Sequence, residues 1–343
     1  MKKIKKSVKI ITAVVLVIVL LLASGVIFYL SKLNLIKFSD GKFRWNGSID
    51  TNDSETIDEQ SRMNDAIADL EEKDAIDATG KIYKDKRFLN ILLIGTDEHT
   101  ENFSENARGD SCMIMSVGKK DGSLKLASLE RGMGMPILDG KYKGQYDWLT
   151  HTFRYGGADL MMREVRECFK VDVERYIRVN FATFKKGIEA VGGIDIELTA
   201  AEAGYVNEGT GLKKYTAGLN HLDGEAALVY ARCRHIDSDW HRIERQRNVI
   251  QAVVTKTKEL DIAELNGLLN NVLPLVQTNL TRLEITELLL LAPKYRGAEI
   301  KQMTVPVSGS YGGMRGLGGR SLFSVDFETN SRALREFIYG IKN

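Results

Sequence analysis

The sequence predicts a mixed α/β (α+β) domain, with helices on both faces of a central mixed sheet and a single transmembrane helix before it. Short apolar runs with strand character alternate with segments of helical periodicity along most of the chain. The chain has 343 residues, of which 43% are hydrophobic and 27% are charged. The chain is too long for a minidomain, and its hydrophobic fraction is too high for a disordered chain, so we expect a sizeable core.

Charge and cysteine content exclude several classes of protein. The formal net charge is only +2, and no dense run of Lys and Arg gives the basic field of a nucleic-acid-binding protein. The three cysteines, Cys112, Cys168 and Cys233, are too few and too widely spaced for a disulfide framework or a paired zinc motif. We therefore expect no nucleic-acid partner and no redox role.

The segment from Ile10 to Leu30 contains no charged residue and is rich in Ile, Val and Leu. At about 1.5 Å per residue, a helix of this length spans a hydrocarbon core of about 30 Å. Five lysines precede it, which places the N-terminus in the cytoplasm and the rest of the chain outside the cell membrane. A cleaved signal peptide ending near Ala23-Ser24-Gly25 is the alternative, but the apolar run continues beyond that site.

Four regions follow from this pattern. Residues 1–9 form a cytoplasmic basic tail, 10–30 the transmembrane helix, 31–86 an extracellular acidic stalk, and 87–343 the folded domain. Between Asn46 and Gly80 the chain carries many more acidic than basic residues and cannot bury a core alone. We interpret it as a solvated spacer with a short helix in its middle.

Within the domain, the run from Phe88 to Ile94 predicts a buried strand that ends before Asp97. The runs 112–117 and 124–129 flank an Asp-Gly turn and predict a hairpin. A glycine-rich segment, 309–319, is interpreted as a mobile surface loop. Further strands are expected at 176–179, 194–198 and 299–305, and helices at 158–169, 181–191, 225–232, 241–260 and 283–291.

Two carboxylates lie at predicted strand ends. Asp97 follows one strand, Asp110 precedes the next, and Arg108 stands two residues away. Paired Asp oxygens of this kind suit Mg²⁺, which completes its coordination with water and phosphate. The alternative is that both are ordinary turn residues.

A second charged cluster extends from Arg232 to Arg247. It holds five arginines within sixteen residues, interleaved with acidic side chains. Guanidinium groups suit bidentate phosphate contacts, whereas a solvated helix held by i,i+4 pairs is the equal alternative. A zinc site built from His235, Asp237, Asp239 and His241 is a further, weaker reading, because no cysteine or helical His-Glu motif supports it.

Taken in order, the blocks from Arg87 to Leu260 resemble the LytR-CpsA-Psr family of Gram-positive cell-wall proteins. The matching segments are Asn90–Asp97, Arg108-Gly109-Asp110, Ala127–Arg131, Leu149-Thr150-His151, Tyr155-Gly156-Gly157, Ala190–Ile194, Leu222–Leu228 and the Arg232–Arg247 cluster. The resemblance implies a membrane-anchored phosphotransferase that moves a glycopolymer, of the teichoic acid or capsular polysaccharide type, from a polyprenyl pyrophosphate carrier onto peptidoglycan. It also implies an apolar cavity for the prenyl tail.

Carried over to this chain, the resemblance implies roles for individual residues. Asp97 and Asp110 would hold Mg²⁺, and the pyrophosphate would be bound by Arg108, Arg131, Arg232, Arg234 and Arg242. The chain departs from the family at Gly132, because Glu130-Arg131-Gly132 stands where Pro-Arg-Asp is usual. Glu130 is therefore a candidate general base from the preceding position, with Asp239 as the next candidate.

The lost carboxylate leaves two functions open. The first is the transferase, with Arg131, Glu130 and Asp239 as catalytic residues. The second is a non-catalytic envelope protein that binds polyprenyl pyrophosphate for scaffolding or regulation.

Overall fold

The computed structural model describes residues 31–43, 54–104, 107–234, 236–259, 262–295 and 298–341. The predicted transmembrane segment, 10–30, lies outside these residues. Among the residues that are described, no helix combines the length and the apolar character needed to cross a bilayer.

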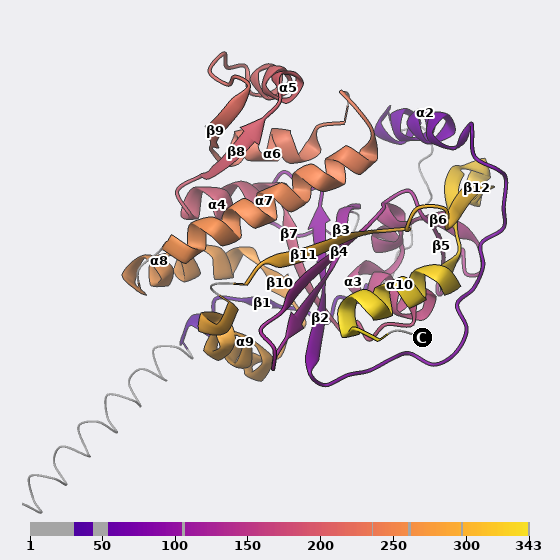
Figure 1. Cartoon of the computed structure of the whole chain (residues 1–343), viewed down its shortest axis with the longest axis horizontal. Coiled ribbons are helices and arrows are strands. Elements are labelled where there is room, and N and C mark those ends of the chain that lie inside the picture. Colours follow the sequence, from indigo (N-terminus) through magenta and orange to yellow (C-terminus); the bar gives the residue numbers. More distant parts are fainter. Residues whose placement is uncertain are drawn as a thin grey trace, which may run out of the picture.

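A seven-stranded mixed sheet forms the centre of the molecule (Figure 1). The predicted hairpin is confirmed, since Cys112 pairs with Leu129 and Val117 with Leu124 in antiparallel register. Parallel pairings join β2 to β7 and β4 to β11. The strands, in spatial order, are β1 (Lys37–Phe38), β10 (Gln277–Thr278), β7 (Arg175–Asn180), β2 (Phe88–Thr96), β3 (Gly109–Gly118), β4 (Leu124–Leu129) and β11 (Ile300–Val305).

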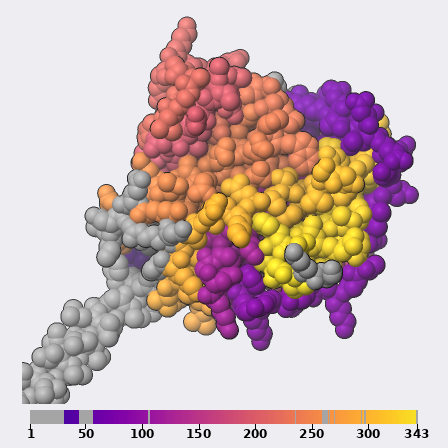
Figure 2. Space-filling model, in the orientation of Figure 1, coloured from indigo at the N-terminus to yellow at the C-terminus, as the bar shows by residue number. Residues whose placement is uncertain are grey.

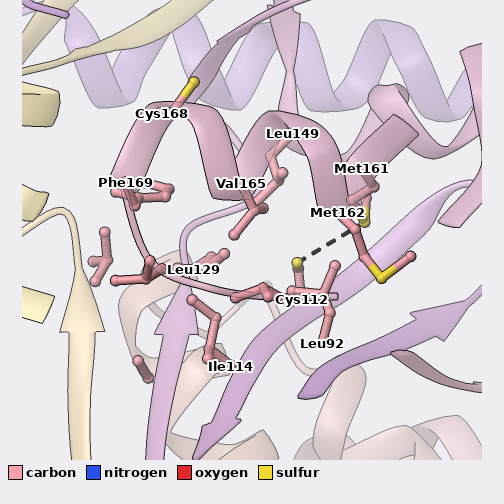
Figure 3. Close-up of a cluster of buried hydrophobic side chains, with 14 of the residues drawn as sticks. Leu92, Cys112, Ile114, Leu129, Leu149, Met161, Met162, Val165, Cys168 and Phe169 are labelled. Carbon is pink, nitrogen blue, oxygen red and sulfur yellow. Dashed lines mark hydrogen bonds between the residues drawn. The ribbon is translucent and has the colours of Figure 1, made fainter. Parts of the chain in front are cut away.

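Alternating side chains of β2 point to opposite faces of the sheet, and each face is covered by helices. Leu92 and Ile94 pack in one cluster with residues of α3 (Leu149–Phe169) and α10 (Phe327–Tyr339). Figure 3 shows part of this cluster, in which Cys112 Sγ lies 3.9 Å from Met161 Sδ of α3. On the other face, Ile91 packs with residues of α9 (Arg282–Tyr295), and Met113 packs with residues of α7 (Asp239–Glu259).

A second layer covers part of the sheet with its own apolar cluster. It is seen in salmon and orange above the sheet in Figure 1. Asn180 and Thr199 each begin a helix with a capping box, because each side chain accepts a hydrogen bond from the third helical N–H. The elements are α4 (Phe181–Ala190), β8 (Ile194–Leu198), α5 (Ala200–Thr210), β9 (Gly218–Leu222), α6 (Gly224–Arg232) and α8 (Ile262–Val272).

The described parts of the expected stalk are packed on the domain, so the interpretation as a solvated spacer is wrong for them. Strand β1 joins the main sheet, and α2 (Ser54–Ile67) buries Met63 against Leu322 and Phe323. Figure 2 shows α2, in indigo, in continuous contact with the rest of the surface. The acidic composition of this segment did not indicate such packing, because only one face of α2 is apolar and buried.

The segment 309–319 is also structured, contrary to the expected mobile loop. Strand β12 (Tyr311–Arg315) pairs antiparallel with β13 (Ser321–Val325). Gly312 and Gly313 sit where the backbone of Glu71 and the side chain of Ile67 approach closely, so glycine here permits close packing of α2 and its C-terminal extension. A short pair, β5 (Gly134–Pro136) and β6 (Tyr146–Trp148), lies beside it.

Candidate functional site

The sheet order itself brings three predicted residues together. Strand β2 ends just before Asp97, its antiparallel neighbour β3 begins at Gly109-Asp110, and β4 ends just before Glu130-Arg131. Antiparallel neighbours place the end of one strand beside the start of the next. Asp97, Asp110 and Arg131 therefore gather at one edge of the sheet.

Arg131 is the centre of this charged cluster. Its guanidinium group contacts three carboxylates: Nη1 lies 2.5 Å from Glu59 Oε1 and 3.7 Å from Asp110 Oδ1, and Nε donates to Asp239 Oδ2 at 3.2 Å. Only 4% of the Arg131 side chain is exposed. Burial opposes its charge, but the carboxylates, Glu59 foremost, raise the pKa of Arg131.

Further arginines surround Asp110. Burial alone would raise the pKa of this carboxyl, but Arg131, Arg234, Arg108 and Arg242 together hold it below its usual value. Arg242 Nη1 also donates to the Asp110 carbonyl oxygen at 3.3 Å. Burial and then the like charges of Arg131 and Arg242 lower the pKa of Arg234. Cations that repel one another in a buried site favour a bound anion.

Asp97 binds Arg108 with both of its carboxylate oxygens. The Arg108 N–H donates to Oδ1 and its Nε to Oδ2, both at 3.0 Å. Burial, and then the charge of Asp110, raises the pKa of Asp97. The two carboxylates thus repel each other, and a divalent cation bound by both would relieve this repulsion. Within the described residues, no group of three or more His, Cys, Asp and Glu side chains could hold a metal.

The two candidate bases have opposite environments. Burial and the charge of Asp239 raise the pKa of Glu130 to about 7, and its Oε1 accepts the Gly132 N–H at 3.2 Å. Burial would raise the pKa of Asp239 too, but Arg242, Arg131 and Arg234 depress it well below its usual range. Glu130 is fully buried, whereas Asp239 lines an open groove.

The Arg232–Arg247 cluster serves two purposes. Arg245 binds Glu202 and Asp237, whereas Arg247 binds Thr304. These two arginines therefore hold α7 in place. Arg232, Arg234 and Arg242 line cavities instead. Among the residues that the structure describes, nothing supports the zinc alternative, because Asp237 and Asp239 are paired with arginines. His235 lies outside the described residues.

An apolar cavity of about 250 Å³ reaches the charged cluster. One wall is the sheet, with Leu93, Met113 and Ile177, and the other is formed by α4, α6 and α7. Asp110, Arg234 and Arg242 also line it, so the cavity meets the cluster around Arg131. Arg232 lies there with its guanidinium group 4.4 Å from the Phe181 ring centroid.

Two polar grooves adjoin the same cluster, one on each side of α2. The helix groove, of about 790 Å³, lies between α2, α5 and α6 and contains Tyr205, Arg232 and Arg234. The aromatic groove, of about 530 Å³, lies between α2 and the start of α7 and contains Arg131, Arg234, Asp239 and Trp240.

Sequence reasoning missed Glu59 and the aromatic groove. Glu59 is 4% exposed although it belongs to an acidic run that is typical of a solvated segment. Its spacing of four residues from Met63 on one face of α2 was the only available signal. Gly132 lies under the same helix: a Cβ there would stand 2.1 Å from Met63 Cε, so α2 occupies the space of a side chain at position 132.

Comparisons with known proteins relate the chain to one family. The model of the LytR_cpsA_psr family matches residues 51–333. A polyisoprenyl-teichoic acid–peptidoglycan teichoic acid transferase, TagU, of Enterococcus faecalis is 33% identical over 226 residues, which are 63% of this chain and 69% of the relative. The protein of the same name from Bacillus mycoides is 32% identical over 209 residues, 60% of this chain and 64% of the relative.

Solved structures share the fold. "TagT bound to LI-WTA" matches with a TM-score of 0.59 and 22% identity over 77% of this chain and 97% of that one. A LytR-CPS2A-psr family protein, YwtF (TagT), with bound octaprenyl pyrophosphate lipid matches with a TM-score of 0.56 and 20% identity over 78% and 97%.

Proposed function

The chain belongs to the LytR-CpsA-Psr family, and on that premise we propose that it is a glycopolymer transferase. Its donor is a polymer of the teichoic acid or capsular polysaccharide type linked to a polyprenyl pyrophosphate, and its acceptor is a hydroxyl group of peptidoglycan. The names of the relatives from Enterococcus faecalis and Bacillus mycoides support this activity.

One observation carries the proposal: an apolar cavity is joined to a buried cluster of arginines. An apolar cavity alone suits many ligands, and an arginine cluster alone suits any phosphate. Together they fit a molecule with an apolar chain at one end and a pyrophosphate at the other. Arg232, Arg234 and Arg242 would contact the phosphate oxygens, and the sheet face with Leu93 and Ile177 would contact the prenyl chain.

The transfer needs charge stabilisation and alignment more than covalent catalysis. The acceptor oxygen forms a bond to the phosphorus that carries the glycan. The bond from that phosphorus to the bridging oxygen breaks, and its electron pair leaves on the lipid phosphate. The hydroxyl proton passes to a carboxylate of the site and then to solvent.

Asp239 is the carboxylate best placed to take this proton, because it lines a groove beside Arg131 and Arg234. In the free protein the arginines make it a weak base. A bound pyrophosphate neutralises these arginines, so the pKa of Asp239 should rise toward its usual value when the donor is present. Glu59 holds Arg131 from the side of α2 and supplies a carboxylate near the place where the family carries one after the arginine.

Asp97 and Asp110 are the residues that would hold Mg²⁺ with the phosphate oxygens. The cation would neutralise charge on the transferred phosphate. Burial, and then the charge of Asp110, raises the pKa of Asp97, and a cation bound between the two carboxylates would relieve this repulsion. We also propose that residues 10–30 anchor the chain with the domain outside the cell, where the lipid-linked donor and peptidoglycan meet.

Binding and transfer test the proposal separately. Full-length protein in detergent should bind octaprenyl pyrophosphate by calorimetry. Ala231→Trp, which fills the apolar cavity, should weaken this binding at least tenfold. Val229→Trp on the same helix faces the helix groove and serves as the matched control, with affinity within twofold of the parent. Equal affinity in both variants and the parent would place the lipid elsewhere.

Transfer is measured with a labelled lipid-linked polymer, Mg²⁺ and peptidoglycan sacculi. Label in the sacculi supports the transferase. Tight lipid binding without any transfer would instead favour a non-catalytic envelope protein.

A further inference from the structure

The apolar cavity and the two polar grooves meet at one residue. Arg234 lines the apolar cavity, the helix groove and the aromatic groove. A guanidinium group that is reached from three directions suits the point where lipid, donor glycan and acceptor come together. Each polar groove could hold a saccharide, and their linings differ.

One wall of the aromatic groove is a cluster of three rings. Trp240 and Tyr311 have ring centroids 5.7 Å apart, Tyr311 and Phe323 5.5 Å, and Trp240 and Phe323 6.2 Å. Phe323 is buried beneath them, while Trp240 and Tyr311 are partly exposed. Aromatic faces contact the C–H face of a sugar ring, and neighbouring carboxylates accept bonds from its hydroxyl groups.

The inner end of this groove holds the reactive groups. Glu59, Arg131, Arg234 and Asp239 all line it. The carboxylates that line the helix groove are instead Asp58, Glu208 and Glu225, none of which contacts Arg131 in the structure as described. An attacking hydroxyl needs a carboxylate beside the phosphate-binding arginines. Of the two grooves as the structure describes them, the aromatic groove offers Asp239, which contacts Arg131 and Arg242.

We propose that the aromatic groove binds the acceptor saccharide, with a sugar ring against Trp240 and Tyr311 and its hydroxyl directed toward Asp239 and Arg131. The helix groove is then left for the donor glycan. This inference rests on the proposed transferase function, to which it adds the site of the acceptor.

The test compares two aromatic substitutions in full-length protein. Trp240→Ala removes the exposed ring. Tyr142→Ala is the matched control, because Tyr142 packs on Tyr155 and lines none of the three hollows. The probe is a soluble peptidoglycan oligosaccharide, whose binding is followed by saturation-transfer NMR and whose KM is measured in the transfer assay.

We expect Trp240→Ala to weaken oligosaccharide binding and to raise the acceptor KM by about tenfold, the size of one stacking contact. Trp240→Phe should recover most of this loss, and Tyr142→Ala should stay within twofold of the parent. Affinity for octaprenyl pyrophosphate, which carries no sugar, should be the same in all of them.

Two results would overturn the assignment. Unchanged oligosaccharide affinity in Trp240→Ala would show that the groove does not hold the acceptor. A weaker affinity of Trp240→Ala for the glycan-bearing donor, with an unchanged acceptor KM, would assign the groove to the donor. Because NMR reports binding without turnover, a protein that binds the oligosaccharide but transfers nothing would contradict the proposed function and leave the groove assignment standing.

Discussion

Two buried charged clusters adjoin the junction of β6 and α3, one around Asp147 of β6 and the other beside Thr150 of α3, and they differ in how their charges are matched. In the first, Asp147 is fully buried and accepts bonds from Tyr155, from Arg320 Nη1 at 3.2 Å and from its neighbour's N–H at 2.8 Å, and it lies 3.0 Å from His151 Nδ1. In the second, Thr150 Oγ1 donates to Asp110 at 3.3 Å, and several arginines surround that one carboxylate.

The difference separates a structural cluster from a binding site. Around Asp147, donors of mixed charge satisfy one carboxylate, and Asp147 lines none of the three hollows described above. Around Asp110, several arginines face one another, and one of them, Arg234, lines all three hollows. A closed network contributes to stability, whereas repelling cations beside a cavity are stabilised only when an anion binds.

The largest expected effect is on stability, from Asp147→Ala. It leaves Arg320 buried without its carboxylate, so we expect a loss of about 3–5 kcal/mol in the free energy of unfolding. Chemical denaturation measures it. Asp159→Ala, which removes a partly exposed pair with Arg163, is the control and should cost less than about 1 kcal/mol. Similar losses in the two variants would show that the Asp147 cluster contributes no more to stability than a partly exposed ion pair.

Arg234→Ala should show the opposite pattern. Loss of one preorganised donor to the phosphate should lower transfer by about 10²-fold. The unfolding free energy should change by less than about 1 kcal/mol, because the removed charge is repelled by Arg131 and Arg242. Arg234→Lys keeps the charge but loses the planar fork, so its activity should fall between those of the parent and Arg234→Ala. Parental activity in Arg234→Ala would show that the arginines are structural.

The pH dependence of stability should also differ in sign between the clusters. The pKa of Glu130 is raised from about 4.5 to about 7, so its contribution to stability is complete below about pH 4.5 and is lost as the pH rises through 7. We therefore compare the unfolding free energy of Glu130→Gln with that of the parent. This difference should favour the variant by about 2 kcal/mol more at pH 8 than at pH 5. Unfolding at both pH values measures this difference.

Asp147 provides the opposite case. Its pKa is lowered, because the bonds from His151 and Arg320 outweigh burial, so its contribution to stability is present at neutral pH and is lost as the pH falls below about 4.

The Glu130 prediction has a clear contrary outcome. If the difference in unfolding free energy between the parent and Glu130→Gln stays constant from pH 5 to pH 8, the assignment of a protonated Glu130 is wrong.

The smallest effect concerns Mg²⁺. Asp97→Asn removes one carboxylate of the proposed pair and should raise the Mg²⁺ concentration for half-maximal transfer by roughly tenfold. Asn keeps one acceptor oxygen for Arg108, and burial and Asp110 disfavour the charge on Asp97, so the loss of stability should be small. Titration of Mg²⁺ in the transfer assay measures the shift. An unchanged Mg²⁺ requirement in both Asp97→Asn and Asp110→Asn would remove the metal assignment.

The sequence by itself determined the local elements and part of the site. Periodicity located the hairpin of β3 and β4 and helices such as α4 and α6, because these depend on neighbouring residues. The sequence put Asp97 and Asp110 at strand ends, and the family resemblance implied a role for Arg131. The antiparallel order of β2, β3 and β4 in the structure then brings the three residues to one edge of the sheet.

Only the tertiary structure decided the rest. It brought Glu59 to Arg131 across 72 residues and Tyr311 to Trp240 across 71. It also decided which arginines of α7 bind neighbouring elements and which face a cavity. Local sequence reports which face of an element is apolar, whereas the partner of that face depends on packing between distant segments. The acidic segment of α2 therefore looked solvated in the sequence, although its buried face completes the site.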